Sequence, residues 1–468
     1  MPDEQPPPPD APPPDDRDTW VDRVLQGTLV LAVLALAASR AGFDPAATWH
    51  RLTASFGNAL DQAVHLASAL GSHPTELPGR PGATPAERAA FDTFRTAYER
   101  AADLQRQKKP SEALPFAEAT ERLDPALLQP ETRGAGLILH ALILADLSRF
   151  DDAQDLLARA RPLVPAPQAH DAFAALAVRR QDWRQAAASL RDYLDAGGKP
   201  TPQTYLALGV SYDHLGDADQ ASDWITRGRA EFPRDPDLAK IAPRFARDAR
   251  SERSMTTRYS DRFALKFVDV PEQAALTDQL LALLDRDFAA VCTTFSFTPD
   301  EIIPVILYPS SSAYYSASGA PQWSAAQYDG KIRLPLPAGA PPSTLDPVIS
   351  HECTHYVVHR LSAQHCPAWL DEGLAQLAER REEAWARDQI ARAGGPLPLT
   401  ALEAPFEHFT DPTQARLAYA TALTTTRRLN QQLGAARIRE LLTQLGTGRP
   451  TAEVLQEYVG LDSSAFTR

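Results

Sequence analysis

The sequence predicts an α-helical repeat solenoid followed by an α+β domain, with one hydrophobic helix near the N-terminus. Three observations lead to this prediction. Residues 85–250 are rich in alanine, leucine and arginine and have helical periodicity with few strand-forming residues. From residue 251 onward, strand-like segments are followed by long helical ones. The stretch 24–39, VLQGTLVLAVLALAAS, has no charge and is the most apolar part of the chain.

The region before the repeats divides into three segments. Residues 1–19 are rich in proline and aspartate and cannot bury an apolar face, so they are predicted to be a disordered tail. Residues 20–40 contain the apolar stretch, which we interpret as a transmembrane signal anchor. Residues 41–84 are predicted to form a weakly amphipathic helix and then a linker, because 73–84 (HPTELPGRPGAT) is full of helix breakers.

The apolar helix has other interpretations. At about 1.5 Å per residue its uncharged stretch falls short of the ~30 Å hydrocarbon core, so a spanning helix is marginal. A cleaved signal peptide is one alternative, although the preceding region is acidic where a signal peptide should be basic. A buried helix of a soluble protein is the other. Arginines flank the stretch on both sides and do not orient it in a membrane.

Within residues 85–250 the predicted helices come in pairs. A small residue near the start of each second helix recurs at Ala113, Ala153, Ala186 and Ala221, in steps of 40, 33 and 35 residues. Paired helices with a period of about 34 residues are typical of a solenoid. An irregular helical bundle with chance periodicity is the alternative interpretation.

The helical pair at 205–233 carries the clearest pattern. Small residues let its two helices approach closely, large ones fill the groove between units, and a proline ends the second helix. These residues are Tyr205, Leu208, Gly209, Tyr212, Ala221, Ile225, Gly228 and Pro233. The unit resembles a tetratricopeptide repeat, which implies a protein partner for the array, whereas the pair around Trp183 is degenerate. Residues 237–250 are then expected to cap the exposed end of the array.

Residues 251–468 are predicted to be the α+β domain. Strands are expected at 262–270, 302–308 and 331–336, because these segments alternate or are continuously apolar. A long amphipathic helix is expected at 274–294, and the chain after Asp346 is predicted to be mostly helical.

Composition narrows the function classes. A formal charge of −13 over 468 residues argues against nucleic acid as a partner, because phosphate binding needs a basic face. The chain has 3 cysteines and no CxxC pair, which excludes a disulfide-stapled scaffold and a zinc ribbon. We interpret the three thiols as unpaired, although Cys353 and Cys366 could pair in an oxidising compartment.

The segment 348–361, VISHECTHYVVHRL, carries a metal-binding pattern. His351 and His355 are four residues apart, so on a helix they lie on one face and can bind one metal ion. Glu352 is offset from them and is expected to reach a water on the metal, as a general base must. The rest of the helix is apolar and therefore buried, and buried histidines and glutamate need a partner. A solvated helix face that spells HExxH by chance is the alternative.

A third ligand is expected from a second helix that follows the proline turn at 366–367. Glu372 and Asp371 are both candidates on this helix, and His365 is a weaker one. His359 follows the motif by one helical turn, but three histidines on one straight helix cannot all reach a tetrahedral ion. We therefore interpret His359 as a supporting residue and Cys353 as a packing residue.

Together, HExxH and the later run Pro-x-Trp-Leu-x-Glu-Gly-x-Ala at 367–375 resemble the gluzincin metallopeptidases. The nearest likeness is to bacterial peptidase-MA-like domains, which are often fused to tetratricopeptide repeats. The resemblance spans about 258–442 and includes PQW at 321–323, DGKIRLP at 329–335 and LAYATA at 417–422. It implies that His351, His355 and Glu372 hold one Zn²⁺ per chain and that Glu352 polarises the attacking water. The role of Asp371 stays open.

Two further assignments concern the substrate. Amide hydrolysis needs a donor for the tetrahedral oxyanion, and Tyr419 lies where similar peptidases place a tyrosine on a later helix. A core-packing role for Tyr419 is the alternative. By analogy with thermolysin-like enzymes, the strand 331–336 is expected to be an edge strand along which an extended peptide pairs.

These features predict a zinc-dependent peptidase that hydrolyses a protein or peptide substrate, with helical repeats for a protein partner. An inactive repeat scaffold with a vestigial site, and a zinc hydrolase of another bond, are the alternatives. The expected location is membrane-anchored and facing the periplasm or exterior, because an unselective peptidase is safer outside the cytoplasm.

Overall fold

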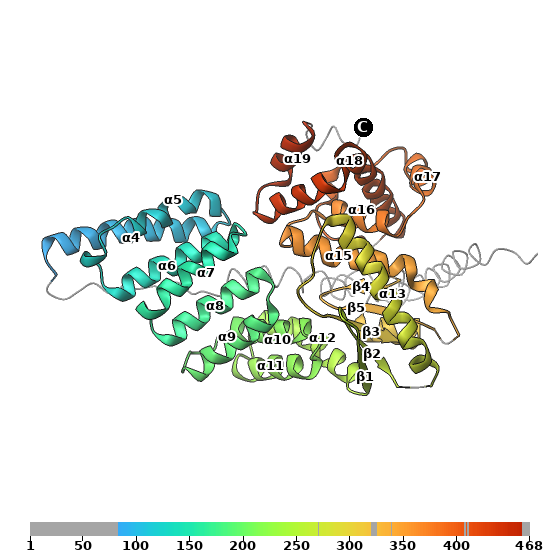
Figure 1. Cartoon of the computed structure of the whole chain (residues 1–468), viewed down its shortest axis with the longest axis horizontal. Coiled ribbons are helices and arrows are strands. Elements are labelled where there is room, and N and C mark those ends of the chain that lie inside the picture. The colour runs from blue at the N-terminus through green and yellow to red at the C-terminus, as the bar shows by residue number, and fades with distance from the viewer. Residues whose placement is uncertain are drawn as a thin grey trace, which may run out of the picture. The chain divides into compact units, whose positions relative to one another are not determined.

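The computed structural model describes residues 83–269, 271–319, 325–337, 339–406, 409 and 411–460. Over these residues the protein is mostly helical and contains a five-stranded mixed sheet (Figure 1). The predicted tail and hydrophobic helix, 1–19 and 20–40, lie outside the described residues. In the part that is described, no helix combines the length and the apolarity needed to cross a membrane.

A series of helices, here called the helical array, fills residues 85–252. Its members are α4 (Pro85–Arg106), α5 (Pro110–Glu121), α6 (Pro130–Asp146), α7 (Phe150–Ala160), α8 (Ala166–Arg180), α9 (Trp183–Asp195), α10 (Pro202–His214), α11 (Ala218–Glu231) and α12 (Pro236–Glu252). Short 3-10 turns at Pro125–Leu127 and Arg161–Leu163 join some of them. Helices adjacent in sequence pack against each other, as the sequence predicts.

Small residues at the helix contacts explain this pairing. The alanines that recur through the repeats, Ala113, Ala153, Ala186 and Ala221, are all 0% exposed. A side chain on Gly209 would lie 2.6 Å from the end of Ile225, so glycine lets Ile225 pack directly on the backbone of α10. Thr84 and Thr201 form capping boxes at the starts of α4 and α10, which satisfies backbone N–H groups at those ends.

The sheet has the strand order β1-β2-β3-β5-β4. The strands are β1 (Met255–Tyr259), β2 (Phe263–Val268), β3 (Ile303–Tyr308), β4 (Gln327–Tyr328) and β5 (Ile332–Pro335). β2, β3 and β5 are parallel, and β1 and β4 pair antiparallel at the two edges. The three predicted strands are confirmed, but the interpretation of 331–336 as an edge strand is wrong. Gln327 and Tyr328 pair with Arg333 and Ile332, so β4 forms the edge.

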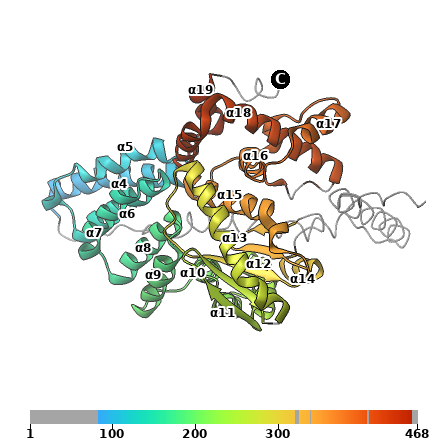
Figure 2. The ribbon, with the colours of Figure 1, turned by 45° about the vertical axis from the view of Figure 1, so that its right-hand side comes forward.

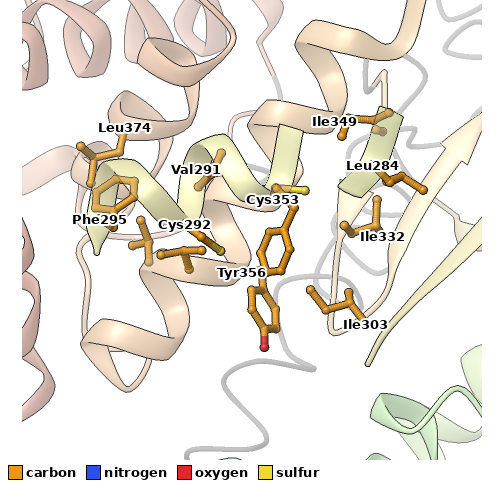
Figure 3. Packing of buried hydrophobic residues seen from close by; sticks show 14 of the residues in the cluster. Leu284, Val291, Cys292, Phe295, Ile303, Ile332, Ile349, Cys353, Tyr356 and Leu374 are labelled. Atoms are coloured by element: carbon orange, nitrogen blue, oxygen red, sulfur yellow. The ribbon is translucent and has the colours of Figure 1, made fainter. Parts of the chain in front are cut away.

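One face of the sheet packs on α13 (Pro271–Phe295) and α15 (Asp346–Ser362). Phe263, Leu265 and Ile303 contribute to this core from the strands, and none is more than 1% exposed. Figure 3 shows Cys353 and Tyr356 of α15 pointing into the same core as Ile303 and Ile332. α13 joins the parallel strands β2 and β3, the connection that parallel pairing requires.

The remaining helices lie beyond the sheet in sequence, apart from α14 (Ser311–Ser318). They are α16 (Ala368–Ala378), α17 (Glu383–Ala393), α18 (Pro412–Gly446) and α19 (Thr451–Val459), with 3-10 turns at Pro342–Leu345 and Leu399–Leu402. α16 packs on both α15 and α18 (Figure 2). The prediction that the chain is mostly helical after Asp346 is confirmed.

The expectation that residues 237–250 cap an exposed end of the array is wrong. These residues lie in α12, which packs on α11 and also on α14. The charged side chains of Arg244, Asp248 and Glu252 are no more than 9% exposed because they pair with charges on the sheet. The sequence gives no sign of this contact, because alternating charges on a helix are equally typical of a solvated face.

Candidate metal centre

The HExxH residues lie on α15, whose apolar positions fix the direction of its histidines. Pro347 in the first turn favours the start of the helix. Ile349 and Val357 are 0% exposed in the core, so the face that carries the histidines turns away from the sheet and toward α16. The rings of His351 and His355 have centroids 4.8 Å apart, as expected one helical turn from each other.

Glu372 on α16 reaches both rings. Its Oε2 atom lies 3.5 Å from Nε2 of His351 and 3.9 Å from Nε2 of His355. This oxygen is buried and has no hydrogen-bond partner among the described residues. The structure thus brings together the three ligands that the sequence predicts, with their donor atoms within 4.8 Å of one another.

A glycine sets the position of Glu372. A side chain on Gly373 would lie 2.0 Å from Oγ1 of Thr426 and 2.7 Å from the carbonyl oxygen of Ala422. Both of these residues belong to α18, so α16 approaches α18 as closely as backbones allow. Glu372 therefore supplies a donor atom, and the neighbouring Gly373 makes the close contact with α18 that holds this part of α16 in place.

Two carboxylates orient the ligand histidines. Nδ1 of His351 lies 3.0 Å from Oε2 of Glu379, and Nδ1 of His355 lies 2.9 Å from Oδ1 of Asp371. A proton on each Nδ1, donated to its carboxylate, leaves the Nε2 lone pair facing Glu372. Asp371, whose role the sequence leaves open, is therefore a partner of His355 in this structure.

Glu379 is the site residue that sequence reasoning missed. It follows Glu372 by seven residues, or about two helical turns, and so lies on the same side of α16. That spacing was the available signal. Acidic residues are common at helix ends, however, and only the packing of α16 on α15 brings this one to His351.

His359 binds Asp371 and does not join the three predicted ligands. Its Nε2 lies 2.9 Å from Oδ2 of Asp371, so this carboxylate bridges His355 and His359. The three form a second group of possible metal-binding atoms that shares His355 with the first. His365, the weaker alternative, belongs to neither group in the described part of the chain.

Acidic neighbours change the pKa of both ligand histidines. Burial opposes the charged ring, but Glu372 and Glu379 raise the pKa of His351 well above its usual range. Burial also disfavours the charged ring of His355. The carboxylate of Asp371 outweighs that effect and raises the pKa of His355 to about 9. In both cases the surrounding carboxylates stabilise positive charge, which is the electrostatic environment that a divalent cation requires.

Glu352 is 5% exposed, and burial raises its pKa above the ordinary glutamate range. A glutamate with a raised pKa holds a proton more readily than an ordinary one, as a general base does. Glu352 lies between the two histidines in the sequence, and its charged neighbours are the histidines and glutamates of the same site. Its predicted function as a base stays a prediction.

Tyr419, on α18, contacts the site and also packs against the hydrophobic core. Its hydroxyl donates a long contact of 3.5 Å to Oε1 of Glu372, and its ring packs edge-on against Phe406. Its backbone oxygen accepts a hydrogen bond of 3.0 Å from Gln376 on α16. Tyr419 is therefore placed to orient Glu372 or to reach a substrate bound beside it.

Neither group of possible metal-binding atoms in the described chain includes a cysteine. Cys292, Cys353 and Cys366 are all unpaired, in agreement with the interpretation from sequence. Cys353 lies within the HExxH motif but is 0% exposed and points into the core (Figure 3). Burial raises the pKa of its thiol well above the usual range, which suits packing and not metal binding.

The donor set of His351, His355 and Glu372 could hold a metal ion. Two imidazole nitrogens and one glutamate oxygen are the ligands of several zinc hydrolases, and a fourth position stays open for water. Donor separations of 3.5 and 3.9 Å suit an ion bonded to each atom at about 2.0–2.2 Å. No protein-family model and no curated protein matches this chain.

Proposed function

We propose that this protein is a zinc-dependent peptidase of the gluzincin type, with His351, His355 and Glu372 as the ligands of one zinc ion per chain. One observation carries the proposal. The buried Oε2 atom of Glu372 lacks a hydrogen-bond partner in the described structure and faces two Nε2 atoms. A buried carboxylate oxygen without a hydrogen bond is costly, and a cation shared with the two imidazoles would remove that cost.

The residues of the site have separate tasks. When bound, zinc would polarise the substrate carbonyl and lower the pKa of a water molecule. Glu352 takes the proton of the attacking water and returns it to the leaving amine. Asp371 and Glu379 hold the rings of His355 and His351 by their Nδ1 atoms. The hydroxyl of Tyr419 is the proposed donor to the oxyanion.

The sheet edge and the helical array complete the proposal. An extended peptide pairs with the outer side of β4, the last strand of the sheet among the described residues, where main-chain hydrogen bonds hold it with little side-chain selectivity. The helical array is of the tetratricopeptide type and binds a protein partner. Residues 20–40 anchor the enzyme in a membrane, and the peptidase faces the periplasm or exterior.

Metal content and turnover test this function together. We expect about one zinc per chain after dialysis of the full-length protein, and loss of that zinc in Glu372→Ala. Glu352→Gln should keep the zinc and lose at least about a hundredfold in cleavage of a mixed peptide library. Cleavage by Glu352→Gln at the parental rate would contradict the mechanism. Failure of the parent protein to take up zinc would favour an inactive repeat scaffold.

A further inference from the structure

The β4–β5 hairpin lies directly beside the metal-binding helix. We call residues 327–335 the edge hairpin. The ring of Tyr328 in β4 packs against His359 and Tyr356 of α15, with centroid distances of 5.5 and 6.1 Å. β4 is the last strand in the order of the described sheet. Its outer side is therefore the strand edge nearest to α15 with which a peptide could pair.

The turn of the edge hairpin is held by a histidine of the helical array. Gly330 has a φ of +98°, and a side chain there would lie 2.4 Å from the ring of His214 at the end of α10. His214 in turn stacks on Trp183 of α9, with centroids 4.1 Å apart. The turn therefore fits against a flat ring that is itself fixed by the array.

An arginine of α12 holds the residue before this glycine. Arg244 donates hydrogen bonds of 2.7 Å to Asp213 of α10 and 3.1 Å to Asp329 of the turn. Arg333 of β5 reaches Asp329 at 3.0 Å and forms two hydrogen bonds to Asp248 of α12, at 3.1 and 2.8 Å. Asp329 is thus held by one arginine from each side of the contact.

A buried lysine adds a third connection. Lys331 is 0% exposed, and its Nζ lies 2.7 Å from Asp213 and 2.8 Å from Glu252. Lys266 of β2 shares Glu252 at 2.8 Å. Buried charges of this kind are stable only when all partners stay in place, because removal of one leaves another unpaired. The edge hairpin can therefore not shift without breaking contacts to α10 and α12.

A separate contact ties the array to α15 itself. Arg360 donates hydrogen bonds of 3.2 Å to the backbone oxygens of both Arg180 and Gln181, where α8 ends. Gln181 has the left-handed backbone of a helix C-cap, so its carbonyl group is among those left unpaired by the helix. The array thus contacts both elements that flank the proposed substrate position, the edge hairpin and the metal-binding helix.

We propose that α10 and α12 of the helical array hold the edge hairpin beside the metal centre, which makes Asp213, His214 and Arg244 positioning residues for an extended peptide substrate. The inference rests on the proposed peptidase function for its substrate and on the contacts above for its geometry. By this account the end of the array nearest the sheet is part of the active site's support. This end of the array is therefore not a module that could be removed without affecting the active site.

Asp329→Asn tests the proposal in the full-length protein. The substitution keeps the size of the side chain and weakens its pairing with Arg244 and Arg333. We expect faster amide hydrogen exchange at residues 327–335 and a rise of about tenfold in KM for a peptide of about six residues. Zinc content, kcat, and KM for a blocked dipeptide that does not reach β4 should stay near parental values. The matched control is Glu121→Gln, which removes a carboxylate paired with His140 and Arg159 elsewhere in the array.

Several outcomes decide the matter. Unchanged exchange and unchanged KM in folded Asp329→Asn would overturn the proposal, and so would equal losses for the long and the short substrate. If Asp329→Asn does not fold, His214→Ala takes its place. The same faster hydrogen exchange at residues 327–335 and the same rise in KM for the long peptide are then expected. A parent protein that binds zinc but cleaves neither substrate rejects the peptidase function alone. Hydrogen exchange then still decides whether α10 and α12 hold the hairpin.

Discussion

At the scale of single residues, the centre depends on carboxylates that do not belong to the ligand set. Glu379 and Asp371 each take one ring nitrogen of a ligand histidine and so decide which nitrogen faces Glu372. Without them each imidazole could rotate or change tautomer, and the two Nε2 atoms would no longer converge. The geometry of the three proposed ligands is thus a property of five residues, of which four lie on α15 and α16 and Glu379 lies at the C-terminal cap of α16.

Glu379→Gln should weaken zinc binding by about 10- to 100-fold, because a neutral amide holds the Nδ1 proton of His351 less strongly than a carboxylate. Competition with a chelator of known affinity measures the change. Glu383→Gln is the control, since Glu383 lies on α17 and pairs with the exposed Arg387 and the partly buried Arg427, away from the site. Equal zinc affinity in Glu379→Gln and the parent would show that Glu379 does not orient His351.

The sequence predicts the ligands better than the residues that support them. His351 and His355 can be placed together because helical spacing alone puts them on one face. Glu372 requires the further expectation of a second helix, and that helix is present as α16. Glu379 could not be found in this way. Its contact depends on the angle at which α16 crosses α15, and local sequence does not encode that angle.

At the scale of elements, the approach of α16 to α18 places Glu372 within reach of both histidines. Gly373 permits this approach because it has no side chain to meet Thr426 and Ala422.

The strands show which elements the sequence alone can and cannot predict. β2, β3 and β5 are apolar on the core face and were predicted, whereas β1 (MTTRY) is largely exposed and β4 is two residues long. Neither carries the alternation that marks a strand.

Gly373→Ala should destabilise the protein by about 1–3 kcal/mol and also lower its zinc affinity, because the added methyl group forces α16 away from α18. Denaturant unfolding of the metal-free protein and a zinc titration measure the two effects. Gly394→Ala is the control. Its backbone is left-handed, with φ +79°, but a side chain there meets nothing within 4 Å. The control should lose stability through strain and keep its zinc affinity, and a matching loss of zinc affinity would refute the crowding argument.

At the scale of the whole described molecule, the helical array and the sheet share one buried set of charges. Within and across this contact, Asp213, Asp248, Glu252 and Asp329 pair with Arg244, Lys266, Lys331 and Arg333. Sequence reasoning treated 85–250 and 251–468 as separate parts, because a change in composition marks where a segment ends and not what it touches. Charged residues in a strand such as KIRLPL are ordinarily solvated, so their burial follows only from the tertiary contact.

His214, at the centre of that contact, should make the stability of the protein depend on pH. Burial lowers its pKa from 6.5 to about 4, against the attraction of Asp213 and Asp329 and with repulsion from Arg244 and Lys331. Between these pH values the unfolded chain binds a proton at this position and the folded protein does not. The free energy of unfolding should therefore fall as the pH drops from 6.5 to 4. The full shift corresponds to a loss on the order of 3 kcal/mol.

His214→Gln isolates this effect, because glutamine does not titrate. Asp213 and Asp329 have lowered pKa values, so their stabilising contribution begins to fade only as the pH approaches about 4. Burial raises the pKa of Asp248 in the same contact, but Asp248 titrates in the parent and the variant alike, so the difference between the two proteins isolates His214. Urea unfolding at several pH values between 7 and 4.5 should show a shallower decline in the variant than in the parent. Parallel declines would mean that His214 is protonated as readily in the folded protein as in the unfolded chain, and that water reaches the contact between array and hairpin.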